Sequence, residues 1–208
     1  MRVVAATKNV GKLRELQAIF APLGWQIEAD PQYVDPAEGE DSYEANAALK
    51  ARALRSQLVA RGESAAVLGD DSGLEVEALG GRPGVLSARY AGADATWPER
   101  RARLLREVSE SAYPSRRARF VCALHLISED GCELVVTRDQ TGRIADSERG
   151  EGGFSYDAIF EYPPLAATFA ELSEEEKNAV SHRALAASAL RQAWDAQRES
   201  GVDQAIRE

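Results

Sequence analysis

Cysteine and histidine are scarce in this chain of 208 residues, which has two of each. No group of cysteine and histidine residues has the spacing of a zinc site. If residues 128–131 form the turn of a hairpin, Cys122 faces a residue near Arg138 and lies well away from Cys132. We therefore expect two free thiols and no disulfide.

An excess of positive charge is also missing. Lysine and arginine number 25 against 34 aspartates and glutamates, which gives a net charge of −9. Such a chain has no long-range field that would gather nucleic-acid phosphates, so any anion site must be local. We expect no nucleic acid polymer among its partners.

Long apolar runs are absent from the start of the chain. The opening stretch MRVVAATKN has five apolar residues before its polar break, too few for a signal-peptide core or a membrane span. The sequence therefore predicts a cytoplasmic protein without a membrane anchor.

Nothing in the composition divides the chain. It has no linker-like shift, internal repeat or low-complexity tract, and its length suits one domain or two closely packed lobes. Apolar residues at 44% and charged residues at 28% are typical of a globular protein. They leave room for a disordered tail only near the end of the chain. We treat 1–208 as a single domain, folded over 1–195, with 196–208 as the segment that could be such a tail.

Hydrophobic periodicity predicts a mixed α/β protein with five to seven strands. The β-α-β pattern at the start favours some parallel pairing. Thr96 and Ser173 are expected to cap helices, the latter in a capping box with Glu176. Helices are expected at 12–24, 42–61, 96–110 and 173–197. Strands are expected at 2–7, 25–29, 65–69, 74–79, 117–128 and 132–144, with a further strand after the glycine-rich loop that starts at residue 150.

The segment TKNVGK, residues 7–12, follows a strand and opens a helix, where free backbone N–H groups favour an anion. It is not a Walker A loop, because the first glycine is missing and Leu13 stands in place of serine or threonine. Thr7 and Asn9 can donate hydrogen bonds and Lys12 adds a charge, which together suit phosphate oxygens. The alternative is an ordinary helix N-cap with a solvated lysine.

Two adjacent carboxylates, Asp70 and Asp71, follow an apolar run in LGDDSGLEVEALGG, residues 68–81. The tetrapeptide 70–73 is ordinary turn chemistry and needs no ligand. Acidic side chains at a strand end, however, gather where α/β proteins bind ligands, and Mg²⁺ would relieve the repulsion between the two. The residues alone leave both interpretations open. A nearby loop adds further carboxylates, which could also be merely solvated: Asp35, Glu38, Glu40 and Asp41.

Two later segments carry ligand-binding chemistry. GGFSYD, residues 152–157, sets aromatic rings beside glycines, which suits stacking on a base, although core burial is the usual fate of such rings. KNAVSHR, residues 177–183, collects donors that could recognise ring oxygens or phosphates, or could simply end a charged helix. A group of arginines on the helix at 96–110 is expected to form a solvated face: Arg100, Arg101, Arg103 and Arg106.

Taken in order, these segments resemble the inosine triphosphate pyrophosphatase family. The resemblance covers nearly the whole chain and rests on TKNVGK with the following KLREL, SYEANAALKA, DDSGLEVEALGGRPGVLSARYAG, GFSYD and EEKNAVSHR. It implies an α/β fold with an elongated central mixed β-sheet flanked by helices, and two lobes with the active site in the cleft between them. It also implies a homodimer that uses Mg²⁺ to hydrolyse ITP, dITP and XTP to the monophosphate and pyrophosphate.

The resemblance assigns roles to single residues. Asp71 would be the catalytic base and a metal ligand, and Glu38 the second metal ligand, ahead of Glu40 and Asp35. Phe154 would stack on the base. The full set of implied substrate-binding residues is Thr7, Lys8, Asn9, Val10, Gly11, Lys12, Lys50, Ser72, Phe154, Ser155, Tyr156, Asp157, Lys177, His182 and Arg183.

Arg183 suits recognition of a 6-oxo group, because a guanidinium only donates hydrogen bonds. The 6-amino group of adenine is itself a donor, so ATP would lose this bond, whereas GTP must be rejected by other means. One departure from the family is Ser155, which replaces the usual glycine of GFGYD and could narrow the base pocket or shift the loop. Asp70 keeps three interpretations: it tunes Asp71, binds metal as well, or holds the loop.

Two other functions stay open. A phosphatase that releases orthophosphate from small phosphorylated metabolites or nucleotides would use similar residues. A nucleotide-binding regulator without turnover would share the phosphate loop and the base pocket but would not need paired carboxylates.

Overall fold

The chain folds around one mixed β-sheet, seen here in a computed structural model that describes residues 1–37, 39 and 42–205. Its strands lie in the order β2-β1-β3-β5-β6-β7-β8, with β4 paired to β3 outside this path. The strands are β1 (Arg2–Ala6), β2 (Gln26–Ala29), β3 (Ala66–Val76), β4 (Pro83–Gly84), β5 (Arg117–Ile127), β6 (Glu133–Ile144), β7 (Phe160–Tyr162) and β8 (Ala167–Thr168). The sheet thus has eight strands, one more than the upper end of the prediction, because β4 and β8 have only two residues each.

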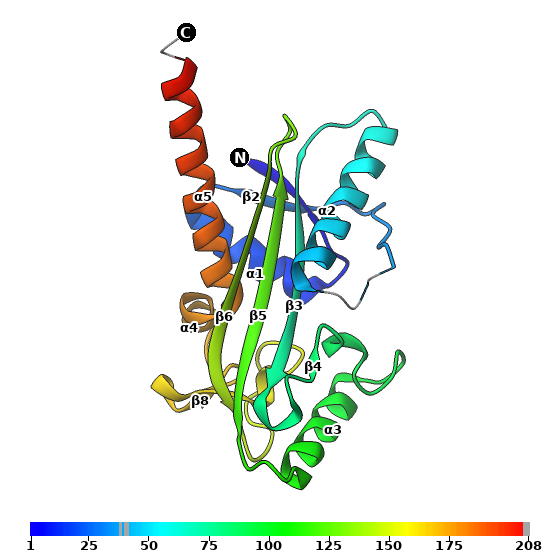
Figure 1. The fold of residues 1–208 in the computed structure, drawn as a ribbon, viewed down its shortest axis with the longest axis vertical. Coiled ribbons are helices and arrows are strands. Elements are labelled where there is room, and N and C mark those ends of the chain that lie inside the picture. The colour runs from blue at the N-terminus through cyan, green and yellow to red at the C-terminus, as the bar shows by residue number, and fades with distance from the viewer. Residues whose placement is uncertain (38, 40–41, 206–208) are drawn as a thin grey trace.

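The helices cover both faces of this sheet. They are α1 (Val10–Phe20), α2 (Tyr43–Ala60), α3 (Trp97–Glu110), α4 (Glu174–Val180) and α5 (His182–Ala205). In Figure 1, α5 lies to the left of the long β5–β6 hairpin and α2 to its right, and the core clusters place α1 with α5 on one face and α2 on the other. Within the described residues, no helix has both the length and the apolar content that crossing a membrane requires.

Alternation along the strands explains this layering. In β1, Val3 and Ala5 belong to the core cluster that includes residues of α1 and α5, whereas Val4 and Ala6 belong to the cluster under α2. Successive strand residues point to opposite faces, so an apolar strand feeds two cores at once. The predicted parallel opening is confirmed, since β1 pairs in parallel with both β2 and β3.

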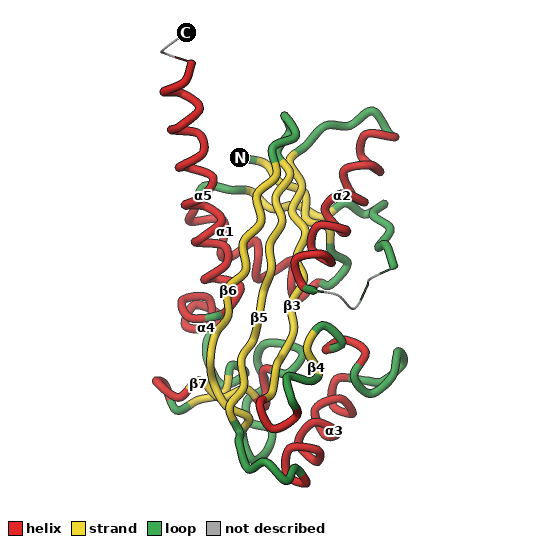
Figure 2. The backbone as a smooth tube through the Cα atoms, viewed as in Figure 1, coloured by secondary structure: helices red, strands yellow, loops and turns green. Residues whose placement is uncertain are grey.

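A separate core lies at the other end of the sheet, where Figure 2 shows α3 beside the short strands. It is built around stacked and tilted aromatic rings, with Phe120 centred 4.5 Å from Phe160 and 5.9 Å from Phe169. Leu104 of α3 is fully buried in the same cluster. The elongated sheet therefore joins two lobes, each with its own core, and the predicted α/β fold with helices on a central mixed sheet is confirmed.

The turn predicted at residues 70–73 is wrong, because β3 is continuous there. Asp70 lies opposite Leu124 and Gly73 opposite Val121 in the antiparallel pairing with β5. A Cβ on Gly73 would lie 2.3 Å from the carbonyl oxygen of Gly84, so this glycine serves a close approach of backbones and not a turn. Strand 74–79 also ends early, since residues 77–79 form a 3₁₀ turn.

Gly69, four residues earlier in β3, also allows two backbones to approach closely. A Cβ there would lie 2.0 Å from the carbonyl oxygen of Ala47 in α2. The missing side chain lets α2 lie unusually close to the strand, directly beside Asp70 and Asp71.

Several local predictions are confirmed. Thr96 and Ser173 each form a capping box. Cys122 lies opposite Arg138 in the β5–β6 hairpin, and both cysteines are free. The C-terminal helix differs from the prediction because it is broken at Ser181, which ends α4 before α5 begins at His182.

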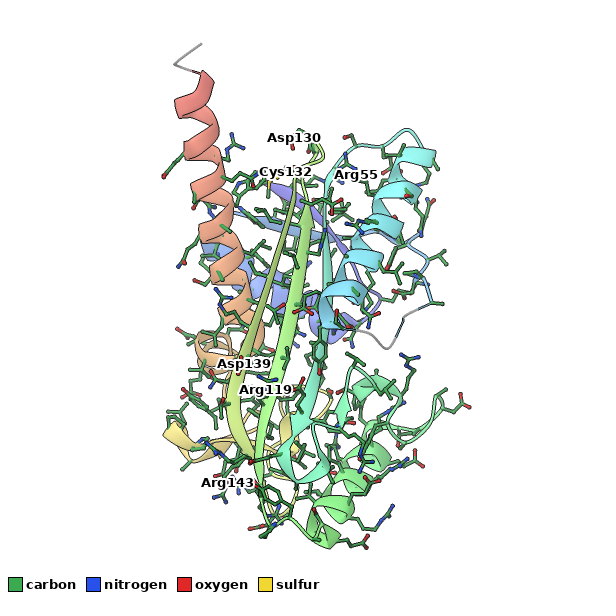
Figure 3. The ribbon with its side chains drawn as sticks, in the orientation of Figure 1. Arg55, Arg119, Asp130, Cys132, Asp139 and Arg143 are labelled. Carbon is green, nitrogen blue, oxygen red and sulfur yellow. The ribbon has the colours of Figure 1, made fainter. Side chains whose placement is uncertain are left out.

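The long hairpin carries charged side chains away from both cores. Figure 3 shows Asp130 and Cys132 at its tip, and Arg119, Asp139 and Arg143 further down the two strands. Arg119 pairs with Glu75 at 2.7 Å and Arg143 with Glu161 at 3.1 Å. These arginines are therefore engaged in ion pairs with neighbouring strands.

Candidate active site

A cleft of about 440 Å³ is lined by residues from both lobes. Most of the substrate residues implied by the sequence line it together with Asp71, namely Thr7, Lys8, Asn9, Lys12, Lys50, Ser72, Phe154, Ser155, Tyr156, Asp157, Lys177, His182 and Arg183. Val10 and Gly11 do not line it, and Val10 is exposed on the first turn of α1. Glu38, Glu40 and Asp41 lie outside the described residues.

The loop before α1 is shaped by its own hydrogen bonds. Asn9 is the N-cap, and its Oδ1 accepts from the backbone N–H of Lys12 at 3.0 Å. The backbone N–H of Asn9 in turn donates to Thr7 Oγ1 at 3.1 Å. The helix thus uses the Asn9 acceptor, which leaves its Nδ2 donor for a ligand at the positive end of the α1 dipole.

Asp71 faces α2 and lines the cleft. Its Oδ1 accepts from Lys50 Nζ at 2.9 Å and its Oδ2 from Asn46 Nδ2 at 3.1 Å. Lys50 and Asn46 lie one helical turn apart on α2, which the close approach at Gly69 brings to the strand. Asp71 is consequently a well-oriented carboxylate at the edge of the cavity.

Asp70 points to the opposite face of β3 and is buried. Lys12 Nζ contacts its Oδ1, and Arg183 Nε donates to its Oδ2 at 2.8 Å. Burial opposes ionisation, yet Arg183 and Lys12 together hold the pKa of Asp70 well below its usual range. Of the interpretations that the sequence left open, these contacts favour a holding role, directed at the two cations.

A buried ionic network continues from Arg183. Arg183 Nη1 contacts Glu15, and its Nη2 donates to Ser72 Oγ at 3.1 Å. Lys177 Nζ contacts both Glu15 and Asp157. Although burial opposes its ionisation, the two cations lower the pKa of Glu15. The network ties α1, β3, α4 and α5 to the loop that carries Asp157.

Sequence reasoning missed Glu15, although a signal was present. It lies three residues after Lys12 on α1, a spacing that sets two side chains on neighbouring positions of one helical face. Asn46 was missed in the same way, four residues before Lys50 on α2.

Phe154 stands over these cations. Its ring centre lies 5.0 Å from Lys177 Nζ and 5.9 Å from the Arg183 guanidinium carbon. A Cβ on Gly11 would lie 2.8 Å from the ring, so this glycine makes room for the aromatic side chain. Phe154 is half-buried and lines the cleft, where its ring can meet a flat ligand.

Ser155 has a φ of +60°, in the left-handed region that favours glycine. This conformation explains why the resembled family has glycine here. The Ser155 carbonyl accepts from Arg101 Nη1 at 2.9 Å, which helps to hold the strained residue. Tyr156, which follows, is buried, and its hydroxyl donates to the Ser87 carbonyl at 3.0 Å.

His182 is buried at the start of α5. Its ring stacks on Phe120, with centres 4.6 Å apart and planes 12° apart. Nδ1 has no hydrogen-bond partner among the described residues. Burial, and secondarily Arg183, lower the pKa of His182 well below its ordinary value, so the imidazole is neutral at pH 7.

Among the cleft residues that sequence reasoning did not single out, three have large aromatic or charged side chains: Arg89, Trp97 and Phe120. Trp97 stands edge-on to Tyr156, with centres 5.4 Å apart, and Arg100 lies 5.0 Å from the Trp97 ring centre. Arg100 is buried and donates to the carbonyls of Gly92 and Ala93, so the predicted solvated arginine face is wrong at this position. The helical period alone did not show which arginine turns inward.

The donor set suits a magnesium ion only in part. Among described residues, no group of three or more His, Cys, Asp or Glu side chains could hold a metal ion by itself. Asp71 and Asp35 nevertheless line the cleft with hard oxygen donors. Mg²⁺ is commonly held by one or two carboxylates together with water and substrate phosphates. The residues present therefore fit an ion that arrives with a triphosphate.

Comparison with known proteins places the chain among relatives. A model of the Ham1 family matches residues 3–193. The dITP/XTP pyrophosphatase of Geobacillus kaustophilus is 45% identical over 196 residues, covering 93% of this chain and 94% of that protein. The dITP/XTP pyrophosphatase of Thermus thermophilus is also 45% identical, covering 93% and 92%.

Solved structures agree. A HAM1 protein from Coxiella burnetii superposes with a TM-score of 0.79 at 35% identity, covering 94% of this chain and 98% of its own. The Staphylococcus aureus Ham1 protein gives a TM-score of 0.78, also at 35% identity, covering 95% and 100%. The resemblance drawn from the sequence segments is therefore confirmed, and this chain belongs to the Ham1 family.

Proposed function

We propose that this protein hydrolyses non-standard purine nucleoside triphosphates, namely dITP, XTP and ITP, to the monophosphate and pyrophosphate. One observation carries the proposal. The cleft holds an oriented carboxylate, Asp71, between a phosphate-type loop at residues 7–12 and a buried arginine, Arg183. The family relatives named dITP/XTP pyrophosphatase support the same chemistry.

Asp71 acts as the general base in this proposal. It accepts a proton from a water molecule whose oxygen forms a bond to the α-phosphorus, while the bond from that phosphorus to the bridging oxygen breaks and pyrophosphate leaves. Lys50 and Asn46 keep the carboxylate oriented. Lys12 and Lys50 stabilise the charge that develops on the leaving group.

Magnesium dependence is part of the proposal. Asp71 would hold the ion, together with one carboxylate of the acidic loop, for which Glu38 is preferred to Glu40 and Asp35. Bound there with the phosphates, Mg²⁺ would neutralise their charge and polarise the scissile centre.

Arg183 supplies the base selection. A guanidinium has five N–H donors, and three of its nitrogens already contact Asp70, Glu15 and Ser72 through one hydrogen each. One hydrogen is left on each of the two terminal nitrogens, Nη1 and Nη2. These can donate to a 6-oxo group of hypoxanthine or xanthine, whereas the 6-amino group of adenine would leave them unpaired.

Two further features belong to the proposal. The protein is a homodimer, which light scattering on a size-exclusion column would test by a mass of about twice the 22.6 kDa of one chain. It works in the cytoplasm on free nucleotides, which fractionation of the native cells would test.

The decisive experiment incubates the protein with ITP, XTP, dITP, ATP and GTP, with Mg²⁺ or with EDTA, and measures pyrophosphate separately from orthophosphate. We expect pyrophosphate from ITP, XTP and dITP only, and only with Mg²⁺. Orthophosphate as the first product would indicate a phosphatase, and nucleotide binding without product would indicate a regulator. Equal rates with ATP and ITP would contradict the role given to Arg183.

A further inference from the structure

The cations that line the cleft differ in their partners. Lys12 contacts Asp70, Lys50 contacts Asp71, Lys177 contacts Glu15 and Asp157, and Arg183 contacts Asp70 and Glu15. Each of these cations is already neutralised by a buried or half-buried carboxylate. A polyphosphate must share them with that carboxylate.

Lys8 and Arg89 also line the cleft, and no carboxylate among the described residues pairs with either. Both side chains are exposed, which places them at the rim of the cavity. Lys8 comes from the loop before α1 and Arg89 from the 3₁₀ turn Ser87–Arg89 between β4 and α3. Residues of α1 and α3 pack in different core clusters, and the two helices lie in different halves of the molecule (Figure 1), so the elements next to these two cations belong to different lobes.

The backbone around Arg89 is held firmly, although the structure shows no ion pair of its side chain with any described residue. Ser87 Oγ donates to the Gly84 carbonyl at 2.7 Å and accepts from the backbone N–H of Leu74 in β3 at 2.9 Å. On the other side of Arg89, Arg103 Nη1 donates to the Tyr90 carbonyl at 2.8 Å. The turn that carries Arg89 is therefore fixed to β3 at Leu74, three residues after Asp71, while the guanidinium lines the cavity.

Arg89 is also the one cation that the segment between β3 and α3 contributes to the cleft lining among the described residues. A nucleoside triphosphate bound on the loop at residues 7–12 would present its outward phosphate oxygens to this wall.

We propose that Arg89 is a substrate-binding residue that grips the polyphosphate chain from the lobe opposite Lys8 and Lys12. This inference rests on the proposed function and extends it. A planar guanidinium donates two parallel hydrogen bonds to one phosphate group, which a lysine cannot do. Because Arg89 pairs with no carboxylate among the described residues, its contact with phosphate is not offset by the loss of an ion pair, and the contact draws the two lobes together.

The test uses Arg89→Gln and Arg89→Lys in the full chain. We expect Arg89→Gln to raise the KM for ITP by about tenfold or more, as for the loss of a charge-assisted hydrogen bond, with kcat changed less. Arg89→Lys should lie between this variant and the wild type. Arg82→Gln is the matched control, since Arg82 lies in the same segment, outside the cleft, and pairs with Glu107.

Inorganic tripolyphosphate separates phosphate binding from base binding. Measured by calorimetry, its affinity should fall in Arg89→Gln by about the same factor as the rise in KM, and should not change in Arg82→Gln. Unchanged tripolyphosphate affinity in a folded Arg89→Gln protein would overturn the inference, whatever its KM. If wild-type protein bound tripolyphosphate but did not hydrolyse ITP, the proposed function would fail while this comparison would still decide the role of Arg89.

Discussion

The two faces of β3 treat identical side chains differently. Asp70 points toward α1 and α5, is buried, and is held by Lys12 and Arg183 without lining the cleft. Asp71 is buried as well, but it points toward α2, lines the cleft, and is held by Lys50 and Asn46. The difference follows from the two-residue period of a strand, which turns neighbours to opposite faces.

The two faces of β3 therefore have different roles: the Asp70 face supports the site, and the Asp71 face carries the reacting carboxylate. On the Asp70 face, charges are buried and mutually neutralised, so they fix the positions of Arg183 and Lys177. On the Asp71 face, a carboxylate meets the cavity where water and substrate enter. A pair of carboxylates in a sequence is therefore not a pair in function unless both side chains reach the same face.

The largest effect is expected from Asp71→Asn. An amide cannot accept the proton from the attacking water, so ITP turnover should fall by about a thousandfold. Nucleotide binding should persist, because the phosphate loop and Arg183 do not depend on Asp71. Pyrophosphate release and calorimetry with ITP measure the two quantities. Asp139→Asn, at an exposed position of β6, is the control and should keep its turnover. Turnover of Asp71→Asn within tenfold of wild type would contradict the role of Asp71.

Asp70→Asn should act mainly on stability. Breaking a buried ion pair from one side leaves Lys12 and Arg183 uncompensated, so the free energy of unfolding should fall by about 3 kcal/mol. Urea denaturation measures this loss. Asp71 is also buried and pairs with Lys50, but Asp70 pairs with two cations. The comparison therefore requires Asp70→Asn to be less stable than Asp71→Asn, and equal stability of the two variants would mean that the faces do not differ as described.

The neutral His182 on the Asp70 side predicts a pH effect. The unfolded chain takes up a proton near the ordinary histidine pKa of 6.5, whereas the buried imidazole does not. Stability from this residue is therefore complete above pH 6.5 and is lost as the pH falls below it, by at most about 1.4 kcal/mol per pH unit. Urea denaturation between pH 7.5 and 5 should show this slope in wild type and in His125→Gln, but not in His182→Gln. A slope unchanged in His182→Gln would rule out this origin.

The smallest effect is expected from Ser155→Gly. Glycine relieves the left-handed conformation but gains freedom in the unfolded chain, so the free energy of unfolding should change by less than about 1 kcal/mol. Thermal unfolding checks this, and the ITP to XTP rate ratio shows whether the Ser155 hydroxymethyl narrows the base pocket. A change of several kcal/mol would mean that the loop is held differently from its present contacts.

Local patterns predicted most of the fold because they are decided locally. Capping residues, helical periodicity and hairpin register depend on neighbours in sequence, and Thr96, Ser173 and the Cys122–Arg138 pairing follow them. The predicted turn at 70–73 failed because β5, whose paired residues lie 48 to 54 positions further along the chain, holds these turn-forming residues extended. Tertiary pairing outweighs local preference there.

The candidate site divides in the same way. The sequence segments located Asp71, Lys50 and Arg183, but not the contacts that hold them. The contact between Glu15 and Arg183 joins residues 168 positions apart, and no spacing rule within one chain segment reaches that far. The sequence could not single out Arg89, because what distinguishes it is that no carboxylate among the described residues pairs with it, and such pairing depends on the tertiary structure.

Gly69 has a consequence for the precision of this site. Its missing Cβ would lie 2.0 Å from the Ala47 carbonyl oxygen, where ordinary contact begins at 3.4 Å, so an alanine would push α2 outward by more than an ångström. Lys50 would move with the helix, away from Asp71, and a displacement of about 1 Å at a catalytic group can cost roughly a hundredfold in rate. The single hydrogen atom that serves as the side chain of Gly69 thus sets how accurately Lys50 and Asp71 are positioned, although Gly69 itself has no functional group.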